Sequence, residues 1–309
     1  MIDKMKMTDR QRQILGWIAV GFSTLIACFW AFWGIIENFH EGWYFPSLWQ
    51  NLGLMLVQYL LMTIIFVAVA LLSVQWPRLG GLIHVAAGIW AFWFFSGASI
   101  VVIVFSITLP LLLLGAFYWL GRPEPKKLAR SLVIGLPLLT LIVCGIEPAI
   151  RVAGRIDDGK HDARLVAGNG VQLVWAPAGP GWPQDGVNWE EAKRRCRYLT
   201  EDGKTLADTP QDIWRLPTVD EAIRSMARHG QNSGGRWNAE TQKASFQKTP
   251  DKESPLWDKY SKVIYWWTAT EVDEKNAYIV VYNGQVWPRP KKAYWGYLGF
   301  RAVKTADRD

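Results

Sequence analysis

The residues best suited to chemistry stand in one short segment near the end of the chain, where aromatic rings and cations follow one another. They are Trp287, Arg289, Lys291, Lys292, Tyr294, Trp295 and Tyr297. Aromatic rings stack on the faces of sugars, and cations bind sulfate, carboxylate or anionic lipid headgroups. Because Pro288 and Pro290 should interrupt a strand, we expect these side chains on an exposed loop. The alternative is that Trp295 and Tyr297 pack against a sheet.

A second candidate region is the stretch 231–261, which is rich in Gly, Ser, Asn, Lys and Pro. A loop of this length in a compact domain is usually functional or disordered, and its large aromatic residues indicate that it packs. We include Trp237 and Trp257 among the candidate ligand-binding residues. Three acids of this stretch have oxygen atoms suited to a cation, namely Asp251, Glu253 and Asp258. Lysines alternate with these acids, so a solvated loop is the preferred interpretation and we predict no metal site.

No set of residues in the sequence matches a known catalytic arrangement. There is no serine nucleophile elbow, no phosphate-binding glycine loop and no His-Glu metal motif. The second half has one cysteine, Cys196, which helical spacing places on a buried face. We therefore predict that the chain is not an enzyme and that it requires no cofactor.

The first 150 residues have the composition of a membrane domain. They contain nine Lys/Arg and six Asp/Glu, whereas the remaining 159 residues contain twenty-five and twenty-one. Apolar stretches of about 18 or more residues are long enough to cross a bilayer as helices. We predict five transmembrane helices, at about 14–36, 51–74, 80–97, 99–120 and 131–150, and the lipid bilayer is then the first partner. A four-span alternative would leave the long 80–120 run unexplained.

The basic residues of this domain predict its orientation. With five spans, all nine fall on one side: Lys4, Lys6, Arg10, Arg12, Arg78, Arg122, Lys126, Lys127 and Arg130. The positive-inside rule places that side, and the N-terminus, in the cytoplasm. We therefore expect a multi-pass protein of the cell membrane whose C-terminal domain is periplasmic or extracellular. His84 and Glu147 lie near enough to the span ends to reach water, which favours an anchor over a transporter.

The second half has an α+β pattern. A polar linker at 151–168, interpreted as a stalk, precedes a domain at 169–309. Helices are predicted to begin at Asn188 and Thr218, each with a glutamate three residues later as in a capping box. Strands are predicted at 171–175, 263–270, 277–282, 285–287 and 298–303, and the first and last of them could pair. Asn283-Gly284 is a strong hairpin signal.

The order of several motifs in this domain resembles a bacterial family of uncharacterised domains. The motifs are Asn188-Trp-Glu-Glu-Ala192 with Cys196 and Leu199, Trp214-Arg-Leu-Pro-Thr218 with Glu221, Tyr265-Trp-Trp-Thr268, Asn283-Gly284 and Gly299-Phe-Arg301. The family is typified by the C-terminal domain of a collagen-like bacterial adhesin (the Lcl C-terminal-domain-like family) and is related to C-type lectins and formylglycine-generating enzymes. The resemblance covers about residues 170–304. It implies a C-type-lectin-like fold, so the whole chain is predicted as an all-α transmembrane region plus an α+β C-type-lectin-like domain.

The motif residues are interpreted as structural. They are Trp189, Trp214, Arg215, Thr218, Glu221, Trp267, Gly284 and Arg301. The tryptophans should supply core area, and the two arginines should clamp strands to loops. The sequence also departs from both related families. A single cysteine cannot form the copper-binding pair of the formylglycine-generating enzymes, and Trp237-Asn238-Ala239 lacks the acid of the calcium-lectin motif.

These observations predict a membrane-anchored, non-catalytic binding or adhesion module outside the cytoplasm. Its ligand would be a glycan, an envelope polymer or a protein. The alternative is an interaction subunit, in which the spans assemble with another membrane protein or with further copies of the chain. An enzyme of the formylglycine-generating superfamily ranks third, behind these two. Nucleic acid is not expected as a partner, because the net charge of +7 divides into +3 on the membrane half, which the topology explains, and +4 spread along the second half.

Overall fold

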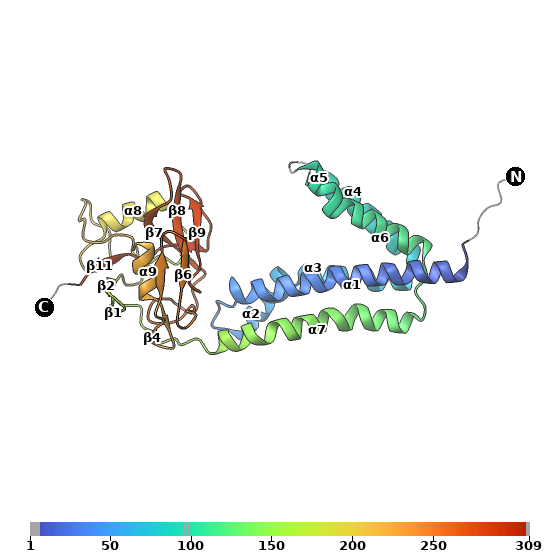
Figure 1. Cartoon of the computed structure of the whole chain (residues 1–309), viewed down its shortest axis with the longest axis horizontal. Helices are drawn as coiled ribbons and strands as arrows, with labels where there is room; N and C mark the ends of the chain where they lie inside the picture. Colours follow the sequence, from blue (N-terminus) through green and yellow to red (C-terminus); the bar gives the residue numbers. More distant parts are fainter. Residues whose placement is uncertain (1–6, 96, 98, 307–309) are drawn as a thin grey trace. The chain divides into compact units, whose positions relative to one another are not determined.

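The computed structural model describes residues 7–95, 97 and 99–306, and the chain divides into two compact units (Figure 1). The helical unit consists of Met1–Gly42 and Leu48–Ile150, and the β-rich unit consists of Trp43–Ser47 and Arg151–Asp309. Long helices form the first unit, whereas the second contains two helices among short strands (Figure 1). The expected combination of a helical region and a mixed α and β region is therefore present.

The helical unit is that of a membrane protein. Its elements are α1 (Asp9–His40), α2 (Leu48–Leu54), η1 (Met55–Tyr59), α3 (Leu61–Gln75), α4 (Pro77–Phe94), α5 (Ile100–Ile103), η2 (Val104–Thr108), α6 (Leu109–Leu120) and α7 (Lys126–Ala153). Among the described residues, three helical stretches are long and apolar enough to cross a membrane: Asp9–His40, Ile100–Leu120 and Lys126–Ala153. A bent pair, Leu48–Tyr59 with Leu61–Gln75, becomes a fourth if its two arms, 60° apart, form one span.

Small residues allow the helices of this unit to approach closely. A Cβ atom on Gly81 of α4 would lie 2.8 Å from the carbonyl oxygen of Gly115 in α6, and a Cβ on Gly115 would lie 2.8 Å from that of Gly81. Backbone contact of this kind is the usual way in which helices associate in a membrane, where the hydrophobic effect supplies little. Glycine at these two positions therefore sets how α4 and α6 pack.

The expectation that His84 reaches water near a span end is wrong. The residue is buried, its Nδ1 lies 2.8 Å from the carbonyl oxygen of Gly80, and its ring stacks on that of Tyr118 at 5.4 Å. The Tyr118 hydroxyl in turn lies 2.7 Å from Ser23 Oγ. His84 is therefore held inside the bundle by its own helix and by Tyr118 of α6, a partner that the spacing along one helix cannot show.

The β-rich unit contains two main sheets and two helices. Its elements are β1 (Arg164–Gly168), β2 (Val171–Trp175), α8 (Trp189–Tyr198), α9 (Val219–Ser225), β3 (Ala227–Arg228), β4 (Gln231–Asn232), β5 (Arg236–Asn238), β6 (Lys243–Ser245), β7 (Tyr265–Glu271), β8 (Asn276–Val281), β9 (Val286–Pro290), β10 (Leu298–Gly299) and β11 (Val303–Thr305). One sheet has the order β1-β2-β11 and the other β10-β7-β8-β9, while β3-β4 and β5-β6 are separate pairs.

Local sequence signals explain several of these elements. The predicted pairing of the first and last strands is confirmed, since β11 runs antiparallel to β2 with Val303 opposite Trp175. The turn at Asn283-Gly284 joins β8 to β9, and Gly284 has a φ of +86°, which favours glycine. β1 is not among the predicted strands, because its residues, Arg164–Gly168, lie within the stretch predicted as the linker.

Both predicted helix caps are present. Asn188 accepts a hydrogen bond from the backbone N–H of Glu191, and Thr218 forms the full reciprocal capping box with Glu221. The Glu191 carboxylate binds Arg194 and Arg195 instead of completing a second box. Hydrogen bonding to Arg194, with smaller contributions from Arg195, lowers the pKa of Glu191 to about 2. α8 ends at Tyr198 and α9 at Ser225, in each case before the next glycine, Gly203 or Gly230.

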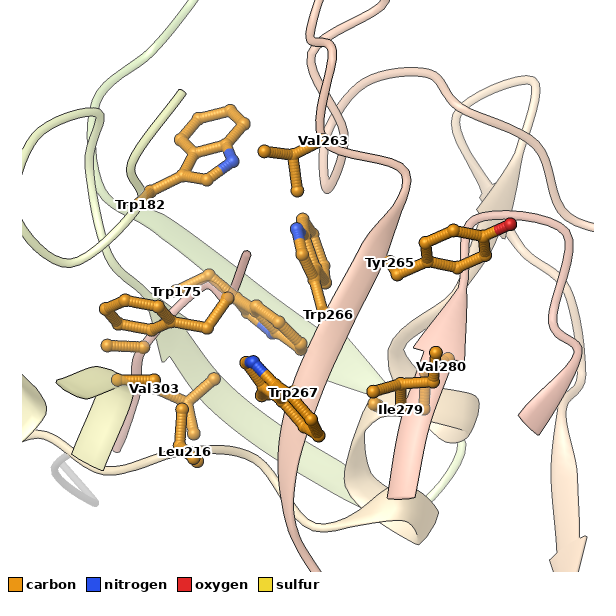
Figure 2. Close-up of a cluster of buried hydrophobic side chains, with 14 of the residues drawn as sticks. Trp175, Trp182, Leu216, Val263, Tyr265, Trp266, Trp267, Ile279, Val280 and Val303 are labelled. Carbon is orange, nitrogen blue, oxygen red and sulfur yellow. The ribbon is translucent and has the colours of Figure 1, made fainter. Parts of the chain in front are cut away.

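Buried tryptophans form much of the core of the β-rich unit (Figure 2). Trp266 of β7 stacks on Trp257 with ring centroids 3.6 Å apart, and Trp175 of β2 lies 5.5 Å from Trp266. Figure 2 shows Trp175, Trp266 and Trp267 gathered between the two sheets, while the ring of Tyr265 points away from them. These indoles supply the large apolar area that a unit with short strands needs to stay folded.

Arg301 confirms the predicted clamp between strands and loops. It is buried and its guanidinium lies 3.7 Å from the centre of the Trp182 ring. Its Nε donates to the carbonyl oxygen of Ala176 at 2.9 Å, and its Nη1 donates to those of Pro255 and Leu256. One side chain therefore holds the end of β2 and the loop after residue 254 in place.

Candidate functional site

The aromatic and cationic segment begins on an edge strand, not on a loop as predicted. β9 pairs on one side only, with β8, and Pro288 and Pro290 stand opposite Tyr278 and Asn276. The backbone N–H of Lys291 donates to the carbonyl oxygen of Lys275. The odd-numbered residues of β9 are therefore those that form backbone hydrogen bonds with β8. The two prolines lie at the alternate positions, where an edge strand directs its N–H groups outward and none is lost. They also prevent a further strand from adding at this edge.

β9, the turn after it and the first residue of β7 form an aromatic face, defined here as Tyr265, Trp287, Arg289, Trp295 and Tyr297. The guanidinium carbon of Arg289 lies 5.3 Å from the Trp287 ring centre and 5.8 Å from that of Trp295. Trp295 stacks on Tyr297 at 5.8 Å, and Tyr297 meets Tyr265 edge-on at 5.4 Å. The cation is therefore held between two indoles, and the rings are supported by the sheet beneath.

Part of this face is open to solvent. Trp295 keeps 40% of its surface exposed, and the neighbouring Tyr294 keeps 67%. Within the described chain, the buried Nε of Arg289 has no hydrogen-bond partner, and Nη1 bonds only the carbonyl oxygen of Pro288. The guanidinium thus retains a donor for a further acceptor, beside the exposed ring of Trp295.

Lys291 has a different role from the one predicted. It is 8% exposed, its Nζ donates to Glu271 and to the carbonyl oxygen of Glu274, and it lies 4.6 Å from the Trp189 ring centre. These contacts tie the end of β9 to the end of β7 and to α8. Lys291 therefore belongs to the scaffold, and the neighbouring Lys292 is the exposed cation.

The two tryptophans of the 231–261 stretch also pack inward. Trp257 is 3% exposed because its ring is stacked on Trp266 in the core, so this ring is not available to a ligand. Trp237 of β5 is half-buried, with its ring edge-on to Tyr278 at 5.8 Å. The stretch is not one long loop, because β4, β5 and β6 lie within it.

Two of the three acids of this stretch, Asp251 and Glu253, belong to a buried ionic cluster, whereas Asp258 is half-buried, and this corrects two expectations. Asp251 is 1% exposed, and its carboxylate oxygens form ion pairs with Arg155 Nη2 at 2.9 Å and Arg228 Nη1 at 2.7 Å. The carboxylate of Glu253 accepts from the backbone N–H of Ile156 at 3.0 Å. Asp251 and Glu253 are therefore not solvated, and residues 155–156 are docked on the domain and are not part of a free stalk. The arginines lie far from the acids in sequence, so local spacing did not indicate the pairing.

Lys252 lies beside this cluster with its side chain fully buried. Its Nζ donates to the carbonyl oxygen of Ser261 at 2.9 Å. Burial, followed by repulsion from Arg155, lowers the pKa of Lys252 to about 7. The amine is closed off from solvent, so it acts on stability and not on a substrate.

A hollow of about 670 Å³ lies between α8 and the residues around Trp214, and the sequence analysis did not predict it. Its arginines are matched by acids: Arg194 binds Glu191, Arg197 binds Asp212 and Arg215 binds Glu221. Cys196 lines it but is buried, and burial raises the pKa of its thiol. Because its arginines are already paired, this hollow is less suited to an anionic ligand than the aromatic face.

Among the residues that the structure describes, no group of three or more His, Cys, Asp or Glu side chains is arranged to hold a metal ion.

Comparison with known proteins reaches only the helical half. Residues 5–130 match a family described as a domain of unknown function (DUF7670). The match extends from α1 to the beginning of α7 and includes none of the strands of the β-rich unit. No curated protein and no solved structure matches the chain.

Proposed function

We propose that the chain is a membrane-anchored, non-catalytic binding module whose aromatic face recognises an anionic polymer, such as an acidic glycan, outside the cytoplasm. The observation that carries the proposal is the placement of the Arg289 guanidinium between the rings of Trp287 and Trp295. A flat sugar ring can stack on the exposed indole while its carboxylate or sulfate meets the cation.

The rigidity of this face supports the proposal. Trp295 rests on Tyr297, which rests on Tyr265 of β7, so the exposed ring has little freedom to lose on binding. Affinity rises when a binding surface is ordered before the ligand arrives. Exposed aromatic and arginine side chains are also those that contribute most to binding free energy.

The charges of the helical unit support the orientation. Arg12, Arg78, Arg122 and Lys126 come from separate segments, and all line one hollow at a single end of this unit. The positive-inside rule assigns that end to the cytoplasm, and an odd number of spans then places the β-rich unit outside. A reporter active only outside the cytoplasm, fused after residue 309, should be active. Activity of a cytoplasm-only reporter at the same site would contradict this orientation.

The C-type-lectin-like fold remains part of the proposal. It is supported by the pairing of β2 with β11, by the two capped helices before the larger sheet, and by the tryptophan core. A carbohydrate ligand is compatible with such a fold, although fold and ligand are separable.

Binding by the full-length protein in lipid nanodiscs tests the function. The probes are heparin, polygalacturonate and neutral dextran, measured by biolayer interferometry. We expect binding of at least one acidic polymer and not of dextran. Trp295→Ala and Arg289→Gln should each weaken it at least about tenfold, equivalent to about 1.4 kcal/mol.

Two matched controls make the test specific. Leu165→Ala removes an exposed apolar side chain from β1, and Arg236→Gln removes an exposed cation from β5. Both should bind as the wild type does. Equal loss in all four variants, or no binding of either acidic polymer, would contradict the proposal. A stoichiometric membrane protein that co-purifies and covers the aromatic face would instead favour an interaction subunit.

A further inference from the structure

The end of the helical unit that contains the start of α1 carries a second candidate site. A hollow of about 980 Å³ is lined there by the ends of α3 and α6, the starts of α1 and α4, and the loop before α7. Ligand sites have volumes of about 300–1,000 Å³, so the hollow is large enough for a phosphate headgroup and its glycerol.

Backbone contacts hold its walls together. The N–H of Arg122 donates to the carbonyl oxygen of Arg12 at 2.8 Å, and the Trp17 indole donates to that of Glu124 at 3.0 Å. A Cβ on Gly16 would lie 2.3 Å from the backbone of Pro123, so α1 and the loop after α6 are in direct contact. The basic side chains on these segments are therefore brought together by a built framework.

The charge of the hollow is strongly positive. Arg12, Arg78, Arg122 and Lys126 line it, and Glu124 is the one acid in the lining. Within the described ranges, no ion pair joins Arg12, Arg78 or Arg122 to a carboxylate. Lys126 Nζ donates to the carbonyl oxygen of Gln75 at 3.5 Å. The hollow is thus lined by three arginines that form no ion pair with a described residue.

The apolar part of the lining indicates which anion suits the hollow. Trp76 and Trp119 are both exposed there, beside Leu79 and Leu120. Indoles at the ends of apolar helices lie at the headgroup level of a bilayer. A free inorganic anion makes no use of such side chains, whereas an amphiphile contacts the cations with its phosphate and the rings with its glycerol and first methylenes.

We propose that this basic pocket binds the phosphate headgroup of an anionic phospholipid. Basic pockets between helix ends are recognised sites for such headgroups, because guanidinium groups form paired hydrogen bonds with phosphate oxygens. The site lies in a different unit from the aromatic face, and the proposal does not depend on the ligand of that face.

Native mass spectrometry of the detergent-purified full-length protein measures this binding. The lipid probes are phosphatidylglycerol and phosphatidylcholine, and inorganic phosphate is added as a soluble competitor. We expect one phosphatidylglycerol to be retained in preference to phosphatidylcholine. Arg12→Gln with Arg122→Gln should weaken its binding about thirtyfold, from the loss of two headgroup cations.

The control is Arg10→Gln with Lys127→Gln, which removes the same charge from nearby exposed positions outside the lining. It should leave lipid binding unchanged. If the Arg12 and Arg122 variant does not fold, Arg78→Gln tests the same claim through an exposed side chain. Equal affinity for the two lipids, or equal loss in test and control variants, would overturn the proposal. Displacement of the lipid by millimolar inorganic phosphate would overturn it too, because it would identify a free-phosphate site.

Discussion

The buried ion pair between Arg155 and Asp251 allows a quantitative prediction. Nε and Nη2 of Arg155 lie 3.0 Å and 2.9 Å from the same Asp251 oxygen, and the guanidinium lies 5.2 Å from the Tyr282 ring centre. Breaking a buried pair by removing one partner costs about 3–5 kcal/mol, because the other charge stays buried. Asp251 keeps Arg228, so Arg155→Met should destabilise the β-rich unit by about 3 kcal/mol, at the lower end of that range.

The single cysteine of the β-rich unit supplies the assay. In a background of Cys28→Ala and Cys144→Ala, the buried thiol of Cys196 reacts only when this unit opens. Its labelling rate against urea, in micelles, measures the free energy of opening within the full-length chain. The exposed Arg236→Met is the control and should change this free energy by less than about 0.5 kcal/mol.

A double-mutant cycle decides whether the pair itself is responsible. Asp251→Asn keeps an acceptor for the backbone N–H of Lys252 but removes the charge. The double variant Arg155→Met with Asp251→Asn should be more stable than the sum of the single changes by about 1–3 kcal/mol. Additive effects, or a loss below about 1 kcal/mol for Arg155→Met, would refute the assignment of a buried, mutually dependent pair.

Three further changes test other parts of the fold. Trp214→Ala removes a buried indole that donates to Thr200, and should lower the free energy of unfolding by about 3–5 kcal/mol in urea titrations; a loss under about 1 kcal/mol would contradict its place in the core. The pKa of Lys252 is about 7 in the folded protein and 10.5 in the unfolded chain. Between these two pH values the unfolded chain binds one proton more than the folded protein, so the free energy of unfolding should rise with pH in this range. Lys252→Met should remove that rise, measured as the difference between the two proteins from pH 7 to 8.5, and identical pH profiles would contradict the shift. Gly115→Leu should lower thermal stability in detergent, because its Cβ would lie too close to the backbone of Gly81. The control Gly135→Leu should not lower it, because the space around Gly135 is open. Equal effects of the two substitutions would refute the close contact between α4 and α6.

Features set by nearby residues could be predicted from the sequence. The Asn188 and Thr218 caps, the Asn283-Gly284 turn and the buried face of α8 depend on residues within a few positions of one another. The apolar runs that form the long helices are also local. The pairing of β2 with β11 is not local, but it followed from alternating patterns at the two ends of one domain.

Features set by distant partners could not be predicted. Asp251 and Arg155 are 96 positions apart, and nothing in either segment marks the other as its partner. Pro288 and Pro290 predict a break in the strand because the sequence does not show that β9 is an edge strand, where prolines are tolerated. The same limit applies to His84, whose partner Tyr118 lies on another helix.

The candidate site was predicted in outline and corrected in detail. Arg289, Tyr294 and Trp295 stand on or beside the aromatic face, as their clustering suggested. Lys291 and Trp257 are of residue types that often bind ligands. Inside the domain, however, Lys291 is hydrogen-bonded to Glu271 and Trp257 is stacked on Trp266. Residue type alone does not distinguish an exposed ring from a core ring, so exposure had to come from the structure.

The protection of two rings by an acidic polymer tests the proposed function most directly. Tyr294 and Trp295 both fall in the tryptic peptide 293–301, which follows Lys292 and ends at Arg301. Hydroxyl-radical oxidation of the full-length protein in nanodiscs, with and without bound polygalacturonate or heparin, reports their exposure by mass spectrometry. If the aromatic face is the binding site, oxidation of both rings falls when the polymer binds, while that of the exposed Leu165 on β1 stays the same. Unchanged oxidation of Tyr294 and Trp295 in a protein saturated with polymer would contradict the proposed site.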